Sequence, residues 1–177
     1  MERGKEDCHI HMVLDGENWK AAIQRHENGP DRQWVRGILE QYARAGYDYL
    51  RDGGDRWGVG AAARSLAGEY GIRYRTPLAP LYHKGHYGSF IGVGFENARE
   101  YRELVCKNKE KDFVKIMISG LMDFDRFGVL TQPGLSAGEI RELVHIAHEE
   151  GYAVMAHANG AEVVRAAAEA GVDSVEH

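Results

Sequence analysis

The chain has 177 residues, of which 44% are hydrophobic, so it is long and apolar enough to form a domain with a core. Its formal net charge is −5 and its acidic and basic residues are mixed, so no basic stripe indicates a nucleic-acid partner. We find no apolar run long enough to cross a bilayer and no signal-peptide pattern at the N-terminus, and therefore expect a cytoplasmic protein without a membrane partner.

Short apolar runs alternate with helical patterns along the chain. The expected strands are 8–13, 47–52, 72–83, 113–119, 152–157 and 172–177. The expected helices are 31–45, 58–70, 96–111, a segment between a capping box at Ser136 and Gly151, and 159–171. The polar stretch after the first strand and the glycine-rich segment 83–94 are predicted to be loops.

This alternation of strands and helices predicts an α/β fold with a parallel sheet. Six consecutive βα units fit either a doubly wound sheet or most of a (β/α)₈ TIM-type barrel. No linker or change of composition divides the sequence, so we expect residues 1–177 to form one domain, as part of an incomplete barrel.

Residues of metal-ligand type stand near the carboxyl ends of these strands, where α/β proteins place their sites. His9 and His11 are two residues apart, so they share a face of the first strand. Lys115 shares a face with Met117, whereas Val114, Ile116 and Ile118 face the other way, towards the expected helices. A lysine inside such an apolar run is costly unless it is paired or neutralised. The set of candidate ligands is His9, His11, Lys115, His157 and His177.

Other polar residues give weaker signals. His145 and His148 lie three apart on a predicted outer helix and are interpreted as surface residues. The segment Gly58-x-Gly60-x-x-Ala63 loosely matches a dinucleotide-binding fingerprint, which leaves a nucleotide-binding oxidoreductase as a further alternative. The candidates for contacts with a substrate are Arg51, Arg126, His83, His86 and Asn159.

Taken together, these segments resemble the amidohydrolase superfamily of metal-dependent barrel hydrolases, in particular its prolidase-type and imidazolonepropionase-like branch. The resemblance rests on DCHIHM at 7–12, YLRDGG at 49–54, VKIMISG at 114–120, AHANGAE at 156–162 and AGVDSVEH at 170–177.

The resemblance implies a binuclear metal-dependent hydrolase of amide or peptide-like C–N bonds. His9 and His11 would bind one divalent ion, and His157 and His177 a second. Lys115 would be carboxylated by CO₂, giving a carbamate that bridges the two ions. Zinc is the metal expected from these ligands, and it would activate a water, held as hydroxide, for attack on a small-molecule amide carbonyl.

The chain also departs from this family. The family's eighth strand supplies an aspartate that binds metal and transfers protons, and we expect that residue beyond position 177, so no catalytic residue is assigned here. Asn159 stands where several relatives have a second histidine. We therefore expect the chain to associate with the missing part of the barrel or with further copies of itself. The alternative to an enzyme is a truncated, non-catalytic barrel fragment that binds metal.

Overall fold

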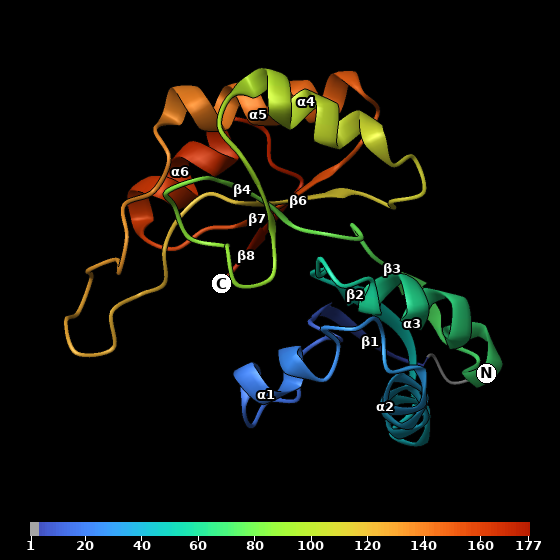
Figure 1. Cartoon of the computed structure of the whole chain (residues 1–177). Coiled ribbons are helices and arrows are strands. Elements are labelled where there is room, and N and C mark those ends of the chain that lie inside the picture. The colour runs from blue at the N-terminus through green and yellow to red at the C-terminus, as the bar shows by residue number, and fades with distance from the viewer. Residues whose placement is uncertain (1–3) are drawn as a thin grey trace. The chain divides into compact units, whose positions relative to one another are not determined.

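The computed structural model describes residues 4–177 and divides into two compact units (Figure 1). The first unit ends at Ala79 and the second runs from Pro80 to His177. Each unit is built from parallel strands with helices between them, as the sequence predicts. Among residues 4–177, none of the helices combines the length and the apolar character that crossing a membrane requires.

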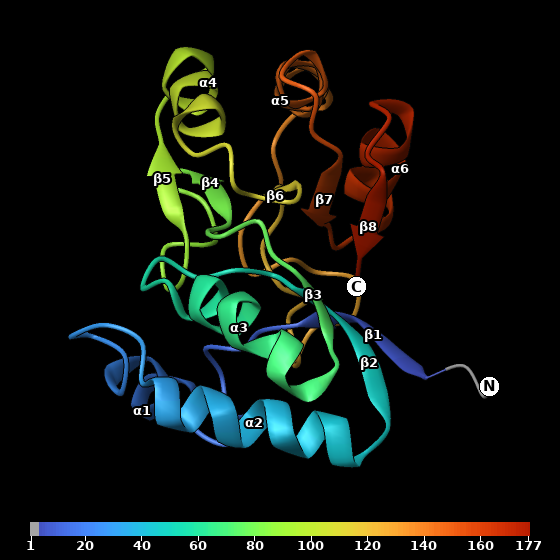
Figure 2. The same ribbon diagram turned by 90° about the vertical axis from the view of Figure 1, so that its right-hand side faces the viewer.

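The first unit contains a three-stranded parallel sheet in the order β1-β2-β3. Helix α2 packs against α3 and β2, and α3 packs against β3 (Figure 2). The Asp31 side chain accepts a hydrogen bond from the backbone N–H of Trp34 and so begins α2. The elements are β1 (Lys5–Ile10), α1 (Trp19–Gln24), α2 (Arg32–Arg44), β2 (Tyr47–Asp52), α3 (Val59–Ala67), the 3₁₀ helix η1 (Gly68–Tyr70) and β3 (Arg73–Arg75).

The second unit contains a five-stranded parallel sheet in the order β5-β4-β6-β7-β8. Helices α4, α5 and α6 lie beside one another over this sheet (Figure 2). The predicted capping box is confirmed, because Ser136 and Glu139 exchange hydrogen bonds at the start of α5. The elements are β4 (Leu81–His83), β5 (Val93–Phe95), α4 (Ala98–Lys107), β6 (Val114–Met117), α5 (Ala137–Glu149), β7 (Val154–His157), α6 (Ala161–Glu169) and β8 (Ser174–Glu176).

The core of the second unit lies between the sheet and its helices. Val114, Ile116 and Ile118 belong to this core, together with Ile140 and Val144 of α5. Met117, which shares its predicted face with Lys115, is also buried and apolar but is not part of this cluster. The alternation predicted for strand β6 is therefore confirmed.

The sequence predicted one strand over residues 72–83, but the structure has two. The segment forms β3 and β4, which belong to the two different sheets. Pro77 and Pro80 stand between them, and a proline cannot donate a hydrogen bond to a sheet. Leu78, between the two prolines, has a positive φ of 69°, which ends the extended conformation.

Three further elements differ from prediction. Strand β1 starts at Lys5 and ends at Ile10, so the expected 8–13 is shifted towards the N-terminus. Helix α1 occupies part of a stretch predicted to be a loop, and Asn18 caps its first turn. Strand β5 lies at the end of the glycine-rich segment 83–94, where it pairs with β4. Short elements of this kind lack the length that makes periodicity visible in a sequence.

The α/β class with parallel sheets is confirmed. The strands form two sheets, and no closed barrel occurs within residues 4–177. The structure divides into two compact units. That residues 1–177 form one partial barrel domain of six βα units stays a prediction.

Candidate metal centre

His9 and His11 lie at the carboxyl end of β1, in the first unit. Their Nε2 atoms face each other at 3.4 Å, and their ring centroids are 5.3 Å apart. His9 belongs to the strand, whereas His11 follows its last residue, and the pairing of β1 with β2 is irregular between Asp7 and Ile10. The two imidazoles nevertheless converge as the His-x-His spacing predicts.

The distance between these nitrogens fits a shared metal ion. Zinc binds imidazole nitrogen at about 2.0–2.1 Å, so two such ligands at a tetrahedral angle have their nitrogens roughly 3.3–3.4 Å apart. The separation of 3.4 Å matches this value without movement of either ring. The same distance also allows a hydrogen bond between the two rings, so the role of His9 and His11 as ligands of one divalent ion stays a prediction.

A cavity of about 610 Å³ opens beside the two histidines, within the first unit. It has the size of a pocket for a small molecule. Its polar lining comes from Asp7, Asp15, Gln41 and Tyr42, in addition to His9 and His11. Its apolar lining includes Ile10, Met12, Leu14 and Ile38.

Asp52, the last residue of β2, is buried close to the same strand end. Its Oδ1 accepts a hydrogen bond from the backbone N–H of Met12 at 3.2 Å, and its Oδ2 accepts one from the Thr76 hydroxyl at 3.1 Å. Burial raises the pKa of Asp52 to about 7, and the nearby charge of Asp55 adds to this rise. The hydrogen bonds oppose the shift because they stabilise the carboxylate.

Asp55 occupies the N-terminus of α3. Its carboxylate accepts hydrogen bonds from the backbone N–H groups of Trp57, Val59 and Gly60, at 2.8, 3.0 and 2.8 Å. A dinucleotide-binding loop needs these donors for a pyrophosphate. Since a carboxylate of the chain already takes them, the structure argues against the nucleotide-binding interpretation of Gly58, Gly60 and Ala63.

Lys115 and His157 lie on neighbouring strands of the second unit. Strands β6 and β7 pair in register, with Lys115 opposite Met155 and Met117 opposite His157. Lys115 is 1% exposed and His157 is 3% exposed, so both side chains are held inside the protein. An ammonium group is costly at such a position, whereas a ligand for a metal ion is expected to be shielded from water.

His157 is surrounded by polar groups and rings of the second unit. Its Nε2 lies 3.2 Å from the Gly120 carbonyl oxygen and 3.2 Å from the side-chain nitrogen of Asn159. The His177 ring packs edge-on against it at 4.8 Å between centroids, and the Tyr87 ring lies at 5.0 Å. Metal binding through Nε2 would require the imidazole to exchange its contacts with Gly120 and Asn159 for the ion.

The charge of Lys115 affects the pKa of His177. Desolvation lowers the pKa of His177, and the positive charge of Lys115 lowers it further. Lys115, His157 and His177 therefore lie near one another in the second unit, and their role as metal ligands stays a prediction. Within residues 4–177, no three side chains of His, Cys, Asp or Glu form a group that could hold a metal ion.

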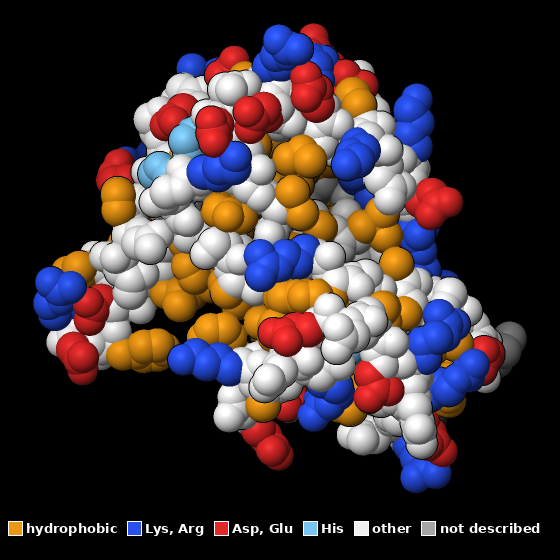
Figure 3. Space-filling model, viewed as in Figure 1, with side chains coloured by type: hydrophobic (Ala, Val, Ile, Leu, Met, Phe, Trp, Pro, Cys, Tyr) orange, Lys and Arg blue, Asp and Glu red, His pale blue; other side chains and the backbone are white. Residues whose placement is uncertain are grey.

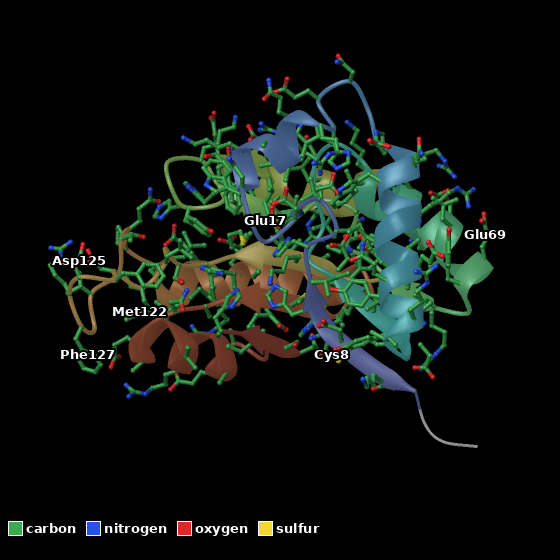
Figure 4. The ribbon with its side chains drawn as sticks, turned by 90° about the horizontal axis from the view of Figure 1, so that it is seen from below. Cys8, Glu17, Glu69, Met122, Asp125 and Phe127 are labelled. Carbon is green, nitrogen blue, oxygen red and sulfur yellow. The ribbon has the colours of Figure 1, made fainter. Side chains whose placement is uncertain are left out.

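The predicted substrate contacts are dispersed. The Nε of Arg51 donates to the Cys8 carbonyl oxygen at 2.7 Å, which ties β2 to β1 in the first unit; Figure 4 labels Cys8 on that strand. His83 and His86, in the second unit, have their ring centroids 5.2 Å apart. His83 lines a separate cavity of about 240 Å³ together with Glu139. The Asn159 side-chain nitrogen donates to the Gly120 carbonyl at 3.2 Å and lies 3.2 Å from Nε2 of His157.

The loop after β6 extends from the second unit. Its ends are joined by an antiparallel bridge between Met122 and Leu130, and Figure 4 shows Asp125 and Phe127 at its far end. Phe124 and Phe127 are fully exposed, and charged side chains share the surface of the loop with hydrophobic ones (Figure 3). The Nη2 atom of Arg126 lies 2.6 Å from Oδ2 of Asp123 in an ion pair. Binding of a substrate by Arg126, as the sequence analysis suggested, would have to compete with this ion pair.

Two results concern residues outside the candidate ligands. His145 and His148 are exposed on α5, as predicted, and contact Glu149 and Asp173 respectively. The sequence analysis missed the buried Asp52, which accepts hydrogen bonds from the Met12 N–H and the Thr76 hydroxyl, although Asp52 lies within the quoted segment YLRDGG at 49–54.

Solved structures with the same fold come from hydrolases. Aspergillus niger ochratoxinase superposes with a TM-score of 0.75 and 21% identity, over 98% of this chain and 46% of its own. A Xaa-Pro dipeptidase with methionine bound in its active site gives 0.72 and 20%, over 98% and 47%. A protein described as an amidohydrolase gives 0.63 and 21%, over 98% and 47%. The chain shares its fold with these hydrolases.

The likeness holds at the level of the fold. The chain spans a little less than half the length of each of these structures. The sequence matches no protein-family model, and a search of curated proteins found no match either.

Proposed function

We propose that the chain belongs to a metal-dependent hydrolase that cleaves amide or peptide-like C–N bonds. The observation that carries this proposal is the His9–His11 pair, with its Nε2 atoms 3.4 Å apart in a fold shared with hydrolases. His9 and His11 would hold one divalent ion, most simply zinc, and His157 and His177 would supply ligands to a second. Ions bound there would supply a water of lowered pKa and a Lewis acid for the carbonyl.

Lys115, in the second unit, would take part in metal binding as a carbamate. The ammonium first loses one proton, the neutral amine nitrogen bonds to the carbon of CO₂, and a second proton leaves the nitrogen, so that a side chain of charge +1 becomes one of charge −1. The carbamate has two oxygen ligands, and its negative charge suits two cations. Lys115 is 1% exposed, which supports this role. A buried, unpaired ammonium group is energetically costly, whereas the negative charge of a carbamate would be balanced by the bound metal ions.

The remaining residues would shape and orient this site. Asn159 and the Gly120 carbonyl orient the His157 ring through the contacts described above. The 610 Å³ cavity beside His9 and His11 offers room for a small amide or dipeptide. One structural relative, a Xaa-Pro dipeptidase, favours a dipeptide as the substrate.

Metal analysis of the purified chain tests the proposal. We expect zinc to bind to the wild type, and a His9→Ala, His11→Ala double variant should bind less zinc because it lacks the ligands of one of the two proposed ions. The matched control is His145→Ala with His148→Ala, which removes two exposed histidines and should retain zinc. Carbon-13 NMR after incubation with labelled bicarbonate should show one carbamate signal that disappears in Lys115→Met.

Hydrolysis assays on dipeptides and aryl amides, with zinc and bicarbonate added, then separate the enzyme from the alternative. Turnover by the chain supports the hydrolase. Zinc binding without turnover supports the non-catalytic metal-binding fragment, a candidate favoured by the fact that the chain spans less than half of its structural relatives. Absence of zinc from the wild type would overturn both.

A further inference from the structure

The backbone around His11 is held by the end of strand β2. The Gly53 N–H donates to the Ile10 carbonyl at 2.7 Å, and Asp52 accepts from the Met12 N–H at 3.2 Å. These two hydrogen bonds lie on either side of His11 in the sequence. Residues 10–12 therefore have little freedom to rotate, although they lie at the irregular end of the strand.

Gly53 also makes room for the imidazole of His11. A Cβ at position 53 would lie 2.3 Å from Cε1, 2.7 Å from Nε2 and 2.9 Å from Nδ1 of that ring. The φ of Gly53 is not in the left-handed region, so its backbone conformation is open to other residues. The His11 ring, rather than the backbone, is what requires a glycine here.

Gly60 makes room for Asp52 in the same way. A Cβ at position 60 would lie 2.2 Å from Oδ2 of Asp52 and 2.7 Å from Oγ1 of Thr76. Gly60 lies in helix α3, where alanine would be preferred by about 1 kcal/mol. The glycine is therefore explained by the buried carboxylate, which in turn holds residue 12.

We propose that Asp52, Gly53, Gly60 and Thr76 form a clamp that positions the His11 imidazole for metal binding. In this clamp Gly53 acts on the ring directly, and Thr76 and Gly60 act through Asp52. The inference rests on the proposed role of His9 and His11 as metal ligands. The clamp proposal adds that the direction in which Nε2 of His11 points is set by residues that do not themselves bind the ion. Removal of such supporting groups typically weakens metal binding 10- to 100-fold.

Three glycine-to-alanine variants of the 177-residue chain test the clamp. Gly53→Ala and Gly60→Ala add a methyl group against His11 and Asp52, whereas Gly37→Ala in helix α2 adds one where no atom lies within 4 Å. We expect Gly53→Ala and Gly60→Ala to lower the zinc affinity at least about tenfold, with the larger effect at Gly53. Gly37→Ala should bind zinc as the wild type does.

A second readout is independent of metal. Ring ¹H–¹⁵N spectra of the metal-free chain report the tautomer and environment of each histidine. The His11 signals should shift in Gly53→Ala and Gly60→Ala and stay in place in Gly37→Ala, while the His148 signals stay in place in all three. Folded Gly53→Ala protein with wild-type His11 signals and zinc affinity would overturn the clamp.

The design separates the clamp from the proposed function. If the wild type binds no zinc, the proposed function fails and with it the clamp's metal role, while the His11 ring signals still decide whether the clamp orients the ring. If Gly53→Ala does not fold, adding His11→Ala should restore folding, because the ring that the methyl group meets is then absent. Failure of that rescue, with unaltered His11 signals in Thr76→Val, would refute the clamp.

Discussion

The two units hold their candidate ligands by different means. In the second unit, Lys115 and His157 belong to neighbouring strands that pair in register, and both side chains are buried. In the first unit, His11 lies beyond the end of β1, where the strand register is irregular. Its position depends on a glycine, a carboxylate and a hydroxyl from segments 40 or more residues away.

The difference shows two sources of precision in one chain. The hydrogen bonds between paired strands fix the direction of every side chain along them, so the position of a ligand residue in its strand determines which way its side chain points. A ligand beyond the ladder needs support from other segments. The second unit should therefore be most sensitive to changes in its apolar core, and the first to the ionisation of its buried polar groups.

The largest expected effect is in the core behind Lys115. Ile116 is 1% exposed and faces the helices from the strand that carries Lys115. Ile116→Ala should lower the free energy of unfolding by about 2–5 kcal/mol, because it leaves a cavity. Urea unfolding measures this loss, and amide exchange should show faster opening at β6 and β7. A loss below about 1 kcal/mol would contradict the prediction, because it would mean that strand pairing is stable without the packing of Ile116 in the core.

The next effect concerns Asp52 in the first unit. Its pKa is about 7 in the folded chain and 3.8 without the fold, so between these values the folded state keeps a proton that the unfolded state releases. Stability should therefore fall as the pH rises from 4 to 7, by at most about 4 kcal/mol for this group.

Asp52→Asn should remove this part of the pH dependence. The measurement is urea unfolding at pH 5 and pH 8 for the wild type and the variant. Asp125→Asn, in the exposed loop, is the control and should keep the wild-type difference between the two pH values. An Asp52→Asn variant with the wild-type difference would contradict the assignment of a buried, proton-retaining carboxyl group.

A smaller effect of the opposite sign is expected at His26. Burial lowers the pKa of His26 in the folded chain, and its Nδ1 accepts the backbone N–H of Asp31 at 3.1 Å. Its stabilising contribution is complete above the unfolded pKa of 6.5 and is lost as the pH falls below that value, since the protonated ring cannot accept.

The expected loss at His26 is of the order of 1 kcal/mol, the net value of one hydrogen bond. His26→Gln keeps an acceptor and should unfold with less acid sensitivity between pH 7 and pH 5. The exposed His145→Gln should not differ from the wild type. Equal acid sensitivity in all three chains would show that His26 contributes nothing to the pH dependence.

The smallest effect sharpens the picture of the second unit. The Tyr101 side chain is buried against Phe95, with ring centroids 5.0 Å apart, and within the part of the chain described its hydroxyl has no hydrogen-bond partner. Tyr101→Phe should leave the free energy of unfolding unchanged or raise it by up to about 1 kcal/mol. Tyr101→Leu loses the ring contact and should be less stable. A clear loss in Tyr101→Phe would reveal a polar partner for the hydroxyl.

Much of this arrangement could be predicted from local pattern. Alternation placed Lys115 opposite the apolar face of β6, and the His-x-His spacing brought His9 and His11 together. The capping box at Ser136 located the start of α5. These features depend on residues a few positions apart, and strand and helix geometry connects such residues directly.

Other features were decided only by tertiary structure. The segment 72–83 became two strands of different sheets, and Gly60 proved to face a buried carboxylate instead of a nucleotide. Likewise, Gly53 is required by the ring of His11, 42 residues away in the chain. Periodicity describes which face of its own element a residue occupies, whereas contacts of this kind depend on which distant segment packs against that face.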